Sequence, residues 1–148
     1  MKYSEKISNK LNELLTKNYD AEAGYKNAAD NVKSTNLKQF FTLRAKERYD
    51  FGHQLKQEIT SYGETPDKGT SFKGDVHRAW MDLKSAVSNN NDEAVLEEAV
   101  RGEKAAIKEY NELLAEPNLP PTVENLIKTQ RNSVETALSK VQTLETVA

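Results

Sequence analysis

Four long stretches of this 148-residue sequence carry apolar residues at steps of three or four, and none carries a sustained alternation of apolar and polar residues. The stretches cover about residues 4–33, 35–62, 92–116 and 122–141. A step of three or four is the period of an amphipathic α-helix, whereas alternation is the period of a half-buried strand. The sequence therefore predicts an all-α protein with four long helices.

The links between these helices predict the topology. Residues 34–36 and 116–122 form short links, and short links join antiparallel helices. Residues 63–91 form a link long enough to return along the bundle, so we expect the second and third long helices to run parallel. Gly63 and Pro66 mark where this link begins, and a helical pattern over residues 75–87 predicts a short fifth helix within it. Residues 1–148 are expected to form a single domain, with Thr122 as the N-cap of the last helix.

The composition excludes several classes of function. Lys and Arg number 21 against 23 Asp and Glu, so the net charge of −2 gives no strong attraction to nucleic acid or to an anionic membrane. The chain has no cysteine, which excludes disulfides, Cys-ligated zinc and thiol catalysis. No apolar run is long enough for a membrane span, and the amphipathic N-terminus is not a secretory signal. A cytoplasmic location is the simplest expectation.

Several polar residues stand where the helical period calls for apolar ones. Glu22 and Glu47 are equally far from the first hairpin turn, so we expect them to face one another near mid-bundle. Glu103 stands on the stripe of the third long helix, at a similar depth. Other polar residues predicted to lie near this layer are Asn18, Tyr25, Arg44, Tyr110 and Gln130.

Carboxylates that meet inside a bundle need a positive charge among them, and two sources are open. One is a metal ion, iron or manganese, held by Glu22, Glu47 and Glu103. The other is a buried salt-bridge layer formed with Arg44, or with Arg48 and Arg101, which we place at the stripe edges. A di-iron site of the usual pattern needs Glu-x-x-His on two helices. Glu47 and Glu103 are followed by Asp50 and Ala106 instead, so a redox-active iron pair is not expected.

Neither histidine supports a catalytic reading. His53 is predicted to point away from the core, and His77 lies beside Trp80 on the expected short helix. No nucleophile triad, phosphate-binding loop or dinucleotide fingerprint is present, so the sequence favours a protein that is not an enzyme. A small-molecule site with His77 and Trp80 as a lid is one further hypothesis.

The chain resembles a bacterial four-helix-bundle family of unknown function within the ferritin-like superfamily. The resemblance spans almost the whole chain and is carried by these residues: Leu11–Leu15, Asp20–Tyr25, Phe40–Phe41, Arg44–Arg48, Gly74, His77–Trp80, Arg101–Glu103, Tyr110, Leu119–Pro120 and Gln130. It implies a ferritin-like bundle with a long crossover, an association with metal or stress, and no established activity. Ferritin-like ligand roles would fall on Glu22, Glu47 and Glu103, with Tyr25, Arg44, Tyr110 and Gln130 around them. The resemblance also implies a histidine near position 137 or 138 in the last helix, where this chain has Ala137 and Leu138 instead.

Taken together, the sequence predicts a structural or interaction module with a degenerate central carboxylate site, forming a homo-oligomer through an outer helix face. The alternative is a carboxylate protein that binds or oxidises iron or manganese.

Overall fold

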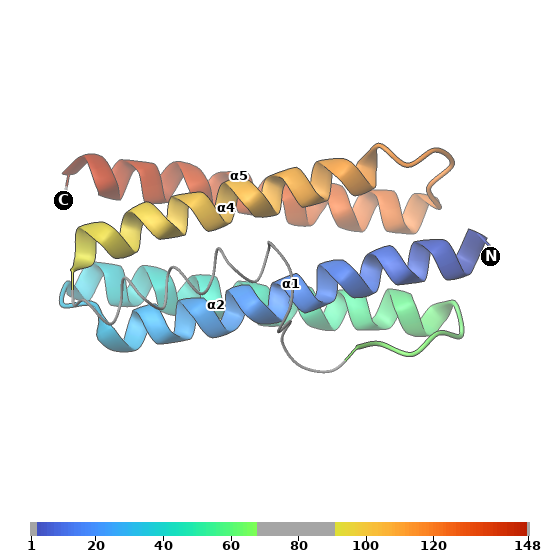
Figure 1. The fold of residues 1–148 in the computed structure, drawn as a ribbon, viewed down its shortest axis with the longest axis horizontal. Coiled ribbons are helices and arrows are strands. Elements are labelled where there is room, and N and C mark those ends of the chain that lie inside the picture. The colour runs from blue at the N-terminus through green and yellow to red at the C-terminus, as the bar shows by residue number, and fades with distance from the viewer. Residues whose placement is uncertain (1–2, 68–90, 148) are drawn as a thin grey trace.

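The computed structural model describes residues 3–67 and 91–147, and in these ranges the chain forms four α-helices (Figure 1). Helix α1 spans Tyr3–Asn31, α2 spans Thr35–Ser61, α4 spans Asp92–Leu114 and α5 spans Pro121–Val147. The all-α prediction is confirmed for this part of the chain. The short helix expected at residues 75–87, with His77 and Trp80, lies outside the described residues. None of the described helices is both long and apolar enough to cross a membrane.

The four helices form a bundle of two antiparallel hairpins, α1–α2 and α4–α5 (Figure 1). The hairpins meet where α1 packs against α4 and α2 against α5, so α2 and α4 lie across the diagonal of the bundle. Helices α2 and α4 run in the same direction (Figure 1), as the long link predicts. A side chain of α2 therefore reaches α4 only through the centre of the bundle.

Local sequence signals account for most of the helix ends. Ser34 and Asn91 are the N-caps of α2 and α4, and their side-chain oxygens accept hydrogen bonds from the backbone N–H groups three residues further on. Gly63 ends α2 with a φ of 76°, a left-handed conformation that glycine adopts without strain. The prediction of Thr122 as the cap of α5 is wrong. The helix begins at Pro121, because proline suits the first helical position, where no N–H partner is needed.

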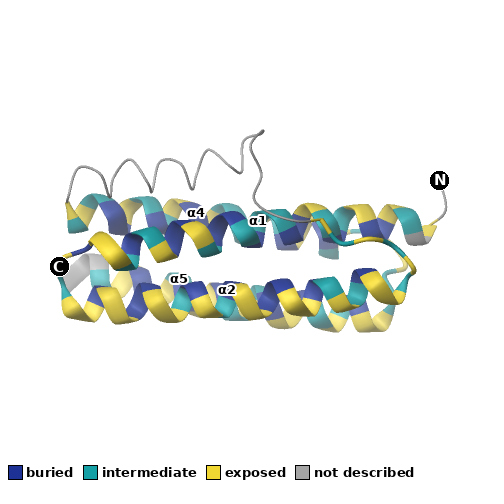
Figure 2. Cartoon of the chain, turned by 90° about the horizontal axis from the view of Figure 1, so that it is seen from below, coloured by how far each residue is buried: buried dark blue, intermediate teal, exposed yellow. Residues whose placement is uncertain are grey.

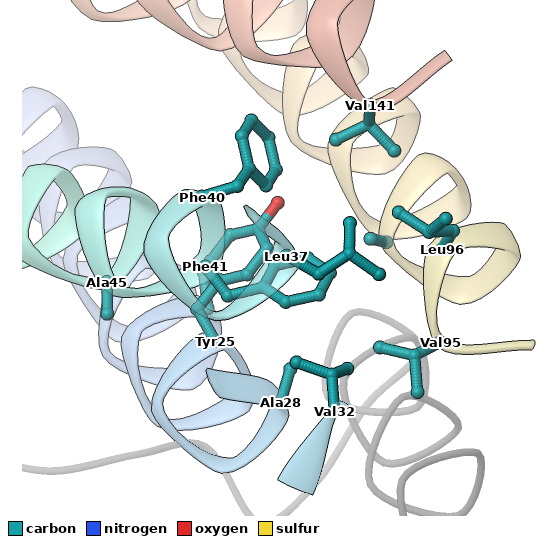
Figure 3. Close-up of a cluster of buried hydrophobic side chains, with 12 residues drawn as sticks. Tyr25, Ala28, Val32, Leu37, Phe40, Phe41, Ala45, Val95, Leu96 and Val141 are labelled. Atoms are coloured by element: carbon teal, nitrogen blue, oxygen red, sulfur yellow. The ribbon is translucent and has the colours of Figure 1, made fainter. Parts of the chain in front are cut away.

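Buried residues lie on the inward faces of the helices and exposed residues on the outer faces (Figure 2). The core consists of two apolar clusters. Figure 3 shows the first, near the α1–α2 turn, where side chains of several helices converge on Tyr25 and Phe41. The second fills the opposite end, around Leu11, Leu55 and Ile127. Between the two clusters lie buried polar residues: Asn18, Arg48, Glu103 and Gln130.

The hairpins are also joined by polar contacts at their ends. The Asp92 carboxylate accepts hydrogen bonds from the backbone N–H groups of Lys33 (3.0 Å) and Ser34 (3.1 Å), which ties the start of α4 to the α1–α2 turn. At the other end, the Tyr3 hydroxyl lies 2.7 Å from the carbonyl oxygens of Pro117 and Asn118 in the α4–α5 link. Asn12 binds the chain beyond α2 through Thr65 and Asp67.

Candidate functional site

Arg48 and Glu103 form a salt bridge at the centre of the bundle. Arg48 stands on α2 and Glu103 on α4, so the pair joins the two diagonal helices. Their side chains are 3% and 0% exposed. Burial by itself lowers the pKa of the Arg48 guanidinium, but the Glu103 carboxylate and the other groups around it reverse this and raise that pKa. The centre of the bundle thus holds one carboxylate already matched by one fixed cation.

Tyr25 of α1 completes this part of the centre. The Arg48 guanidinium lies 5.9 Å from the centroid of the Tyr25 ring, within the range of a cation–π contact. The Tyr25 ring also stacks on the Phe41 ring, with the ring centroids 5.7 Å apart (Figure 3). Burial raises the pKa of the Tyr25 hydroxyl well above its usual value, and the nearby Glu103 carboxylate adds to that rise. Tyr25 is therefore a neutral phenol at physiological pH.

A second set of buried hydrogen bonds links all four helices. The Tyr110 hydroxyl of α4 donates to the Gln130 carbonyl of α5 (2.8 Å), and the Asn18 amide of α1 lies 3.4 Å from the same hydroxyl. The Gln130 amide donates to α2, at the Gln54 side chain (2.9 Å) and the Phe51 carbonyl (3.3 Å). Burial raises the pKa of Tyr110 to about 12. These bonds fix the rotation of each helix next to the Arg48–Glu103 pair.

The structure does not bring the three predicted carboxylates together as one ligand set. Only Glu103 lies in the centre of the bundle. Glu47 pairs with Arg44 on its own helix (3.3 Å), and burial raises the pKa of its carboxyl although Arg44 works against this. Glu22 pairs with Lys26 (2.8 Å) in the groove on the outer side of α1 and α2. Within residues 3–67 and 91–147, no three His, Cys, Asp or Glu side chains are grouped as a metal site would require.

The positive charge in the centre of the bundle comes from Arg48, which helical periodicity wrongly placed at the edge of the apolar stripe of α2. Arg101 is mostly exposed and pairs with Glu98 on its own helix (3.2 Å). Arg48 lies three residues after Ala45 and four before Gly52, and all three are buried. This spacing puts Arg48 on the same helical face as two small buried residues, a signal that was present in the sequence.

Beside the pair is a small cavity, lined in part by Asn18, Arg48 and Tyr110. Its volume of about 10 Å³ is close to that of one water-sized sphere. Among the described residues, the Asn18 Oδ1 and Arg48 Nε atoms have no protein hydrogen-bond partner. The space suits a bridging water and is far below the hundreds of cubic ångströms that a small-molecule substrate needs.

His53 is exposed on α2, as predicted, with its ring 4.5 Å from that of Tyr49. His77 and Trp80, the residues of the lid hypothesis, lie outside the described residues.

Comparison with protein families gives one match, to a domain of unknown function, DUF2383, over residues 6–116. This range is about three quarters of the chain. The chain belongs to this family. The matched range contains Tyr25, Arg48, Glu103 and Tyr110, whereas Gln130 on α5 lies beyond it. No curated protein matches the sequence.

Proposed function

We propose that this DUF2383 protein is a non-catalytic structural or interaction module with a ferritin-like topology and a degenerate central carboxylate site. The observation that carries the proposal is the buried Arg48–Glu103 salt bridge. In ferritin-like carboxylate proteins, glutamates from the bundle helices project inward onto metal ions. Here an arginine takes the place of the cation.

The electrostatics support this reading. A divalent ion is held by several carboxylates because each one offsets part of its charge and of its desolvation. Glu103 is already paired, and the Arg48 guanidinium would repel a second cation at the same carboxylate. The two other predicted ligands, Glu22 and Glu47, have cations of their own.

The small size of the cavity at the polar layer also supports a role without catalysis. The cavity beside Arg48 is the size of about one water molecule. The two buried tyrosines have raised pKa values, so neither is poised as an acid or base near pH 7. A cytoplasmic location and a homo-oligomer remain predictions from the sequence.

Elemental analysis of protein purified without a metal-affinity tag tests the proposal, together with melting curves in Fe(II) and Mn(II). We expect less than a tenth of a metal ion per chain, as a rough threshold, and no rise in Tm above that caused by Mg(II). Glu103→Gln serves as the matched variant, because a metal bound at this centre would lose its main ligand. One or two ions per chain, with a rise in Tm that Glu103→Gln abolishes, would overturn the proposal in favour of an iron or manganese carboxylate protein.

A further inference from the structure

The outer face of α2 carries apolar side chains that the bundle does not use. Three large hydrophobic residues are exposed among the described side chains, and two of them, Leu43 (57%) and Tyr49 (51%), stand on α2. The Tyr49 ring meets the His53 ring edge to face at 4.5 Å, so two aromatic rings are held together at this surface. Leu43 lies on the side of α2 that faces α5 and Tyr49 on the side that faces α1, so the two exposed apolar side chains flank the outer ridge of α2.

The surface has a shallow groove on each side of α2. A shallow groove of about 530 Å³ runs between α2 and α5, with Phe40, Leu43 and Leu144 among its lining residues. A second groove of similar volume runs between α2 and α1, next to Ala45 and Tyr49. Helix α2 therefore stands between two shallow grooves on the surface of the bundle.

The opposite seam of the bundle, between α1 and α4, is different in character. Lys6 and Lys10 pair with Glu116 at 3.2 Å, and Lys17 pairs with Glu109. The charged side chains of this surface are therefore already paired with one another within the chain. Of these two sides of the described bundle, the α2 side is therefore the one suited to an apolar contact.

The charges on the α2 face indicate which partner fits. Lys46 and Asp50 are 72% and 51% exposed, pair with each other at 3.4 Å within one chain and lie between Leu43 and His53 in the sequence. A second copy of α2, antiparallel to the first about an axis at residue 48, places Asp50 of that copy opposite Lys46. The same axis places Leu43 opposite His53 of the second copy. A two-fold contact needs such a self-complementary surface.

We propose that α2 is the interface of a homodimer in which the two α2 helices pack antiparallel about a two-fold axis near residue 48. This inference rests on the proposed role as an interaction module and names its partner. In this arrangement the two Tyr49 side chains lie next to the axis on one flank of the contact, intermolecular Lys46–Asp50 ion pairs lie near its centre, and each Leu43 is level with His53 of the other copy. The net charge of −2 per chain opposes this association only weakly.

The register follows from the rise of 1.5 Å per residue and can be tested by cross-linking. The two copies of residue 49 are about 3 Å apart along the axis, whereas the two copies of residue 43 are about 15 Å apart. Residue 43 of one copy is level with residue 53 of the other. Because the chain has no cysteine, single Cys substitutions report on this geometry without a background.

We expect Tyr49→Cys to form an intermolecular disulfide under mild oxidation, at a rate independent of protein concentration once the dimer is populated. Leu43→Cys should cross-link poorly by itself, but efficiently when mixed with His53→Cys. Glu124→Cys on the outer face of α5 is the control and should not cross-link faster than a random collision allows. Equal rates for all variants, or efficient cross-linking of Leu43→Cys alone, would overturn the proposed register.

Sedimentation equilibrium of the full chain, over about 1 μM to about 1 mM, tests the interface independently. Lys46→Asp should raise the dimer Kd about tenfold, since two symmetric contacts become repulsive. The charge swap Lys46→Asp with Asp50→Lys should restore the wild-type Kd. Lys128→Glu, which breaks the exposed Lys128–Glu124 pair on α5, should leave the Kd unchanged.

A wild-type chain that stays monomeric to about 1 mM would overturn the dimer, as would a dimer insensitive to Lys46→Asp. Either result leaves the proposed non-catalytic role standing, because that role is tested at Glu103 and not by the oligomeric state. A monomer whose α2 face captures another protein would likewise refute the second copy as the occupant.

Discussion

Arg48 and Glu103 determine the chemistry at the centre of this bundle. Removing two opposite charges from water costs several kcal/mol for each ion, and only close pairing offsets that cost. The structure meets this condition, since each charged side chain has the other as its salt-bridge partner and both are almost fully buried. A buried ion pair of this kind makes a small contribution to net stability, but losing one member is costly because the other is left unpaired.

Tyr110 contributes to stability in a way that depends on pH. Its pKa is raised to about 12 in the folded protein, so the unfolded chain loses this proton more easily. The stability from this group is fully present below the unfolded pKa of about 10 and is lost as pH rises toward 12. We expect Tyr110→Phe to lower the free energy of unfolding by about 1–3 kcal/mol at pH 7, because Gln130 loses its donor. Between pH 10 and 12, the free energy of unfolding of this variant should fall less steeply than that of the wild type.

Urea unfolding at pH 7, 10 and 11 measures this effect, with the exposed Tyr49→Phe as control. The difference in the free energy of unfolding between wild type and Tyr110→Phe should decrease as pH rises. A gap that widens above pH 10 would show that Tyr110 is not the protected phenol described here.

Glu47 is predicted to destabilise the fold slightly at neutral pH. Its pKa is raised because the cost of burying its charge exceeds the attraction of Arg44. The penalty is full above the folded pKa and disappears as pH falls below the unfolded value of about 4.3. We expect Glu47→Gln to raise the free energy of unfolding at pH 7 by up to about 1 kcal/mol, with no gain at pH 4. A variant less stable than wild type at pH 7 would mean that the Arg44 pair dominates.

Helical periodicity in the sequence identified Asn18, Tyr25, Glu103, Tyr110 and Gln130 as polar residues on apolar faces, and all five are buried. It failed for the partner of Glu103. A regular step of 100° per residue centres the apolar stripe of α2 on Arg44 and Glu47, which puts Arg48 at the edge of the stripe. The buried face of α2 is instead centred on Ala45, Arg48 and Gly52. This difference in the rotation of α2 decides which arginine is buried, Arg48 or Arg44.

At the scale of the helices, two glycines of the α2 region test how backbone conformation contributes to stability. Gly63 has a φ of 76°, so Gly63→Ala should cost about 1 kcal/mol through strain alone, with no side-chain atom within 4 Å of the added Cβ. Gly52 lies inside the helix, and its added Cβ would meet Leu15 at 3.6 Å, an ordinary contact. Gly52→Ala should therefore stabilise by about 0.5–1 kcal/mol. Thermal unfolding measures both, and a shift in Tm of the same sign for the two variants would contradict the opposite roles assigned to these glycines.

The two hydrogen bonds that the Asp92 carboxylate accepts from the α1–α2 turn should hold the two hairpins in register. Asp92→Ala removes the acceptor of two backbone N–H groups in the α1–α2 turn and should lower the free energy of unfolding by about 1–3 kcal/mol. Glu93→Ala is the matched control, because Glu93 lies in the same helical turn and is exposed. Chemical denaturation of the two variants gives the comparison. Equal losses of the free energy of unfolding in the two variants would mean that the helix dipole, and not the hydrogen bonds to Asp92, causes the effect.

The helices themselves were predictable because each is long, amphipathic and bounded by Ser34, Gly63, Asn91 and the proline pair before residue 122. The exact ends of the helices were harder to predict. Thr122 has the residue type of an N-cap, but Pro121 fits the first helical position and the carbonyl of Pro120 accepts the first helical hydrogen bond (2.9 Å).

At the scale of the whole molecule, the lengths of the links predicted the direction of every helix. Two short links and one long one leave α2 and α4 parallel, and they lie on the diagonal of the bundle. Link lengths carry no information about how each helix is rotated about its own axis. That rotation puts Arg48 beside Glu103 in the centre and turns Glu22 outward, so the places of Arg48 and Glu22 needed the structure.

A double-mutant cycle on Arg48 and Glu103 tests most directly the claim that an ion pair replaces a metal at the centre. The free energies of unfolding are measured in urea with chelator present, for wild type, Arg48→Met, Glu103→Leu and the double variant. We expect each single variant to lose about 3–5 kcal/mol and the double variant to lie close to wild type. A Glu103→Leu variant as stable as wild type, with no coupling to Arg48, would contradict the account, because a carboxylate awaiting a metal is relieved by its removal.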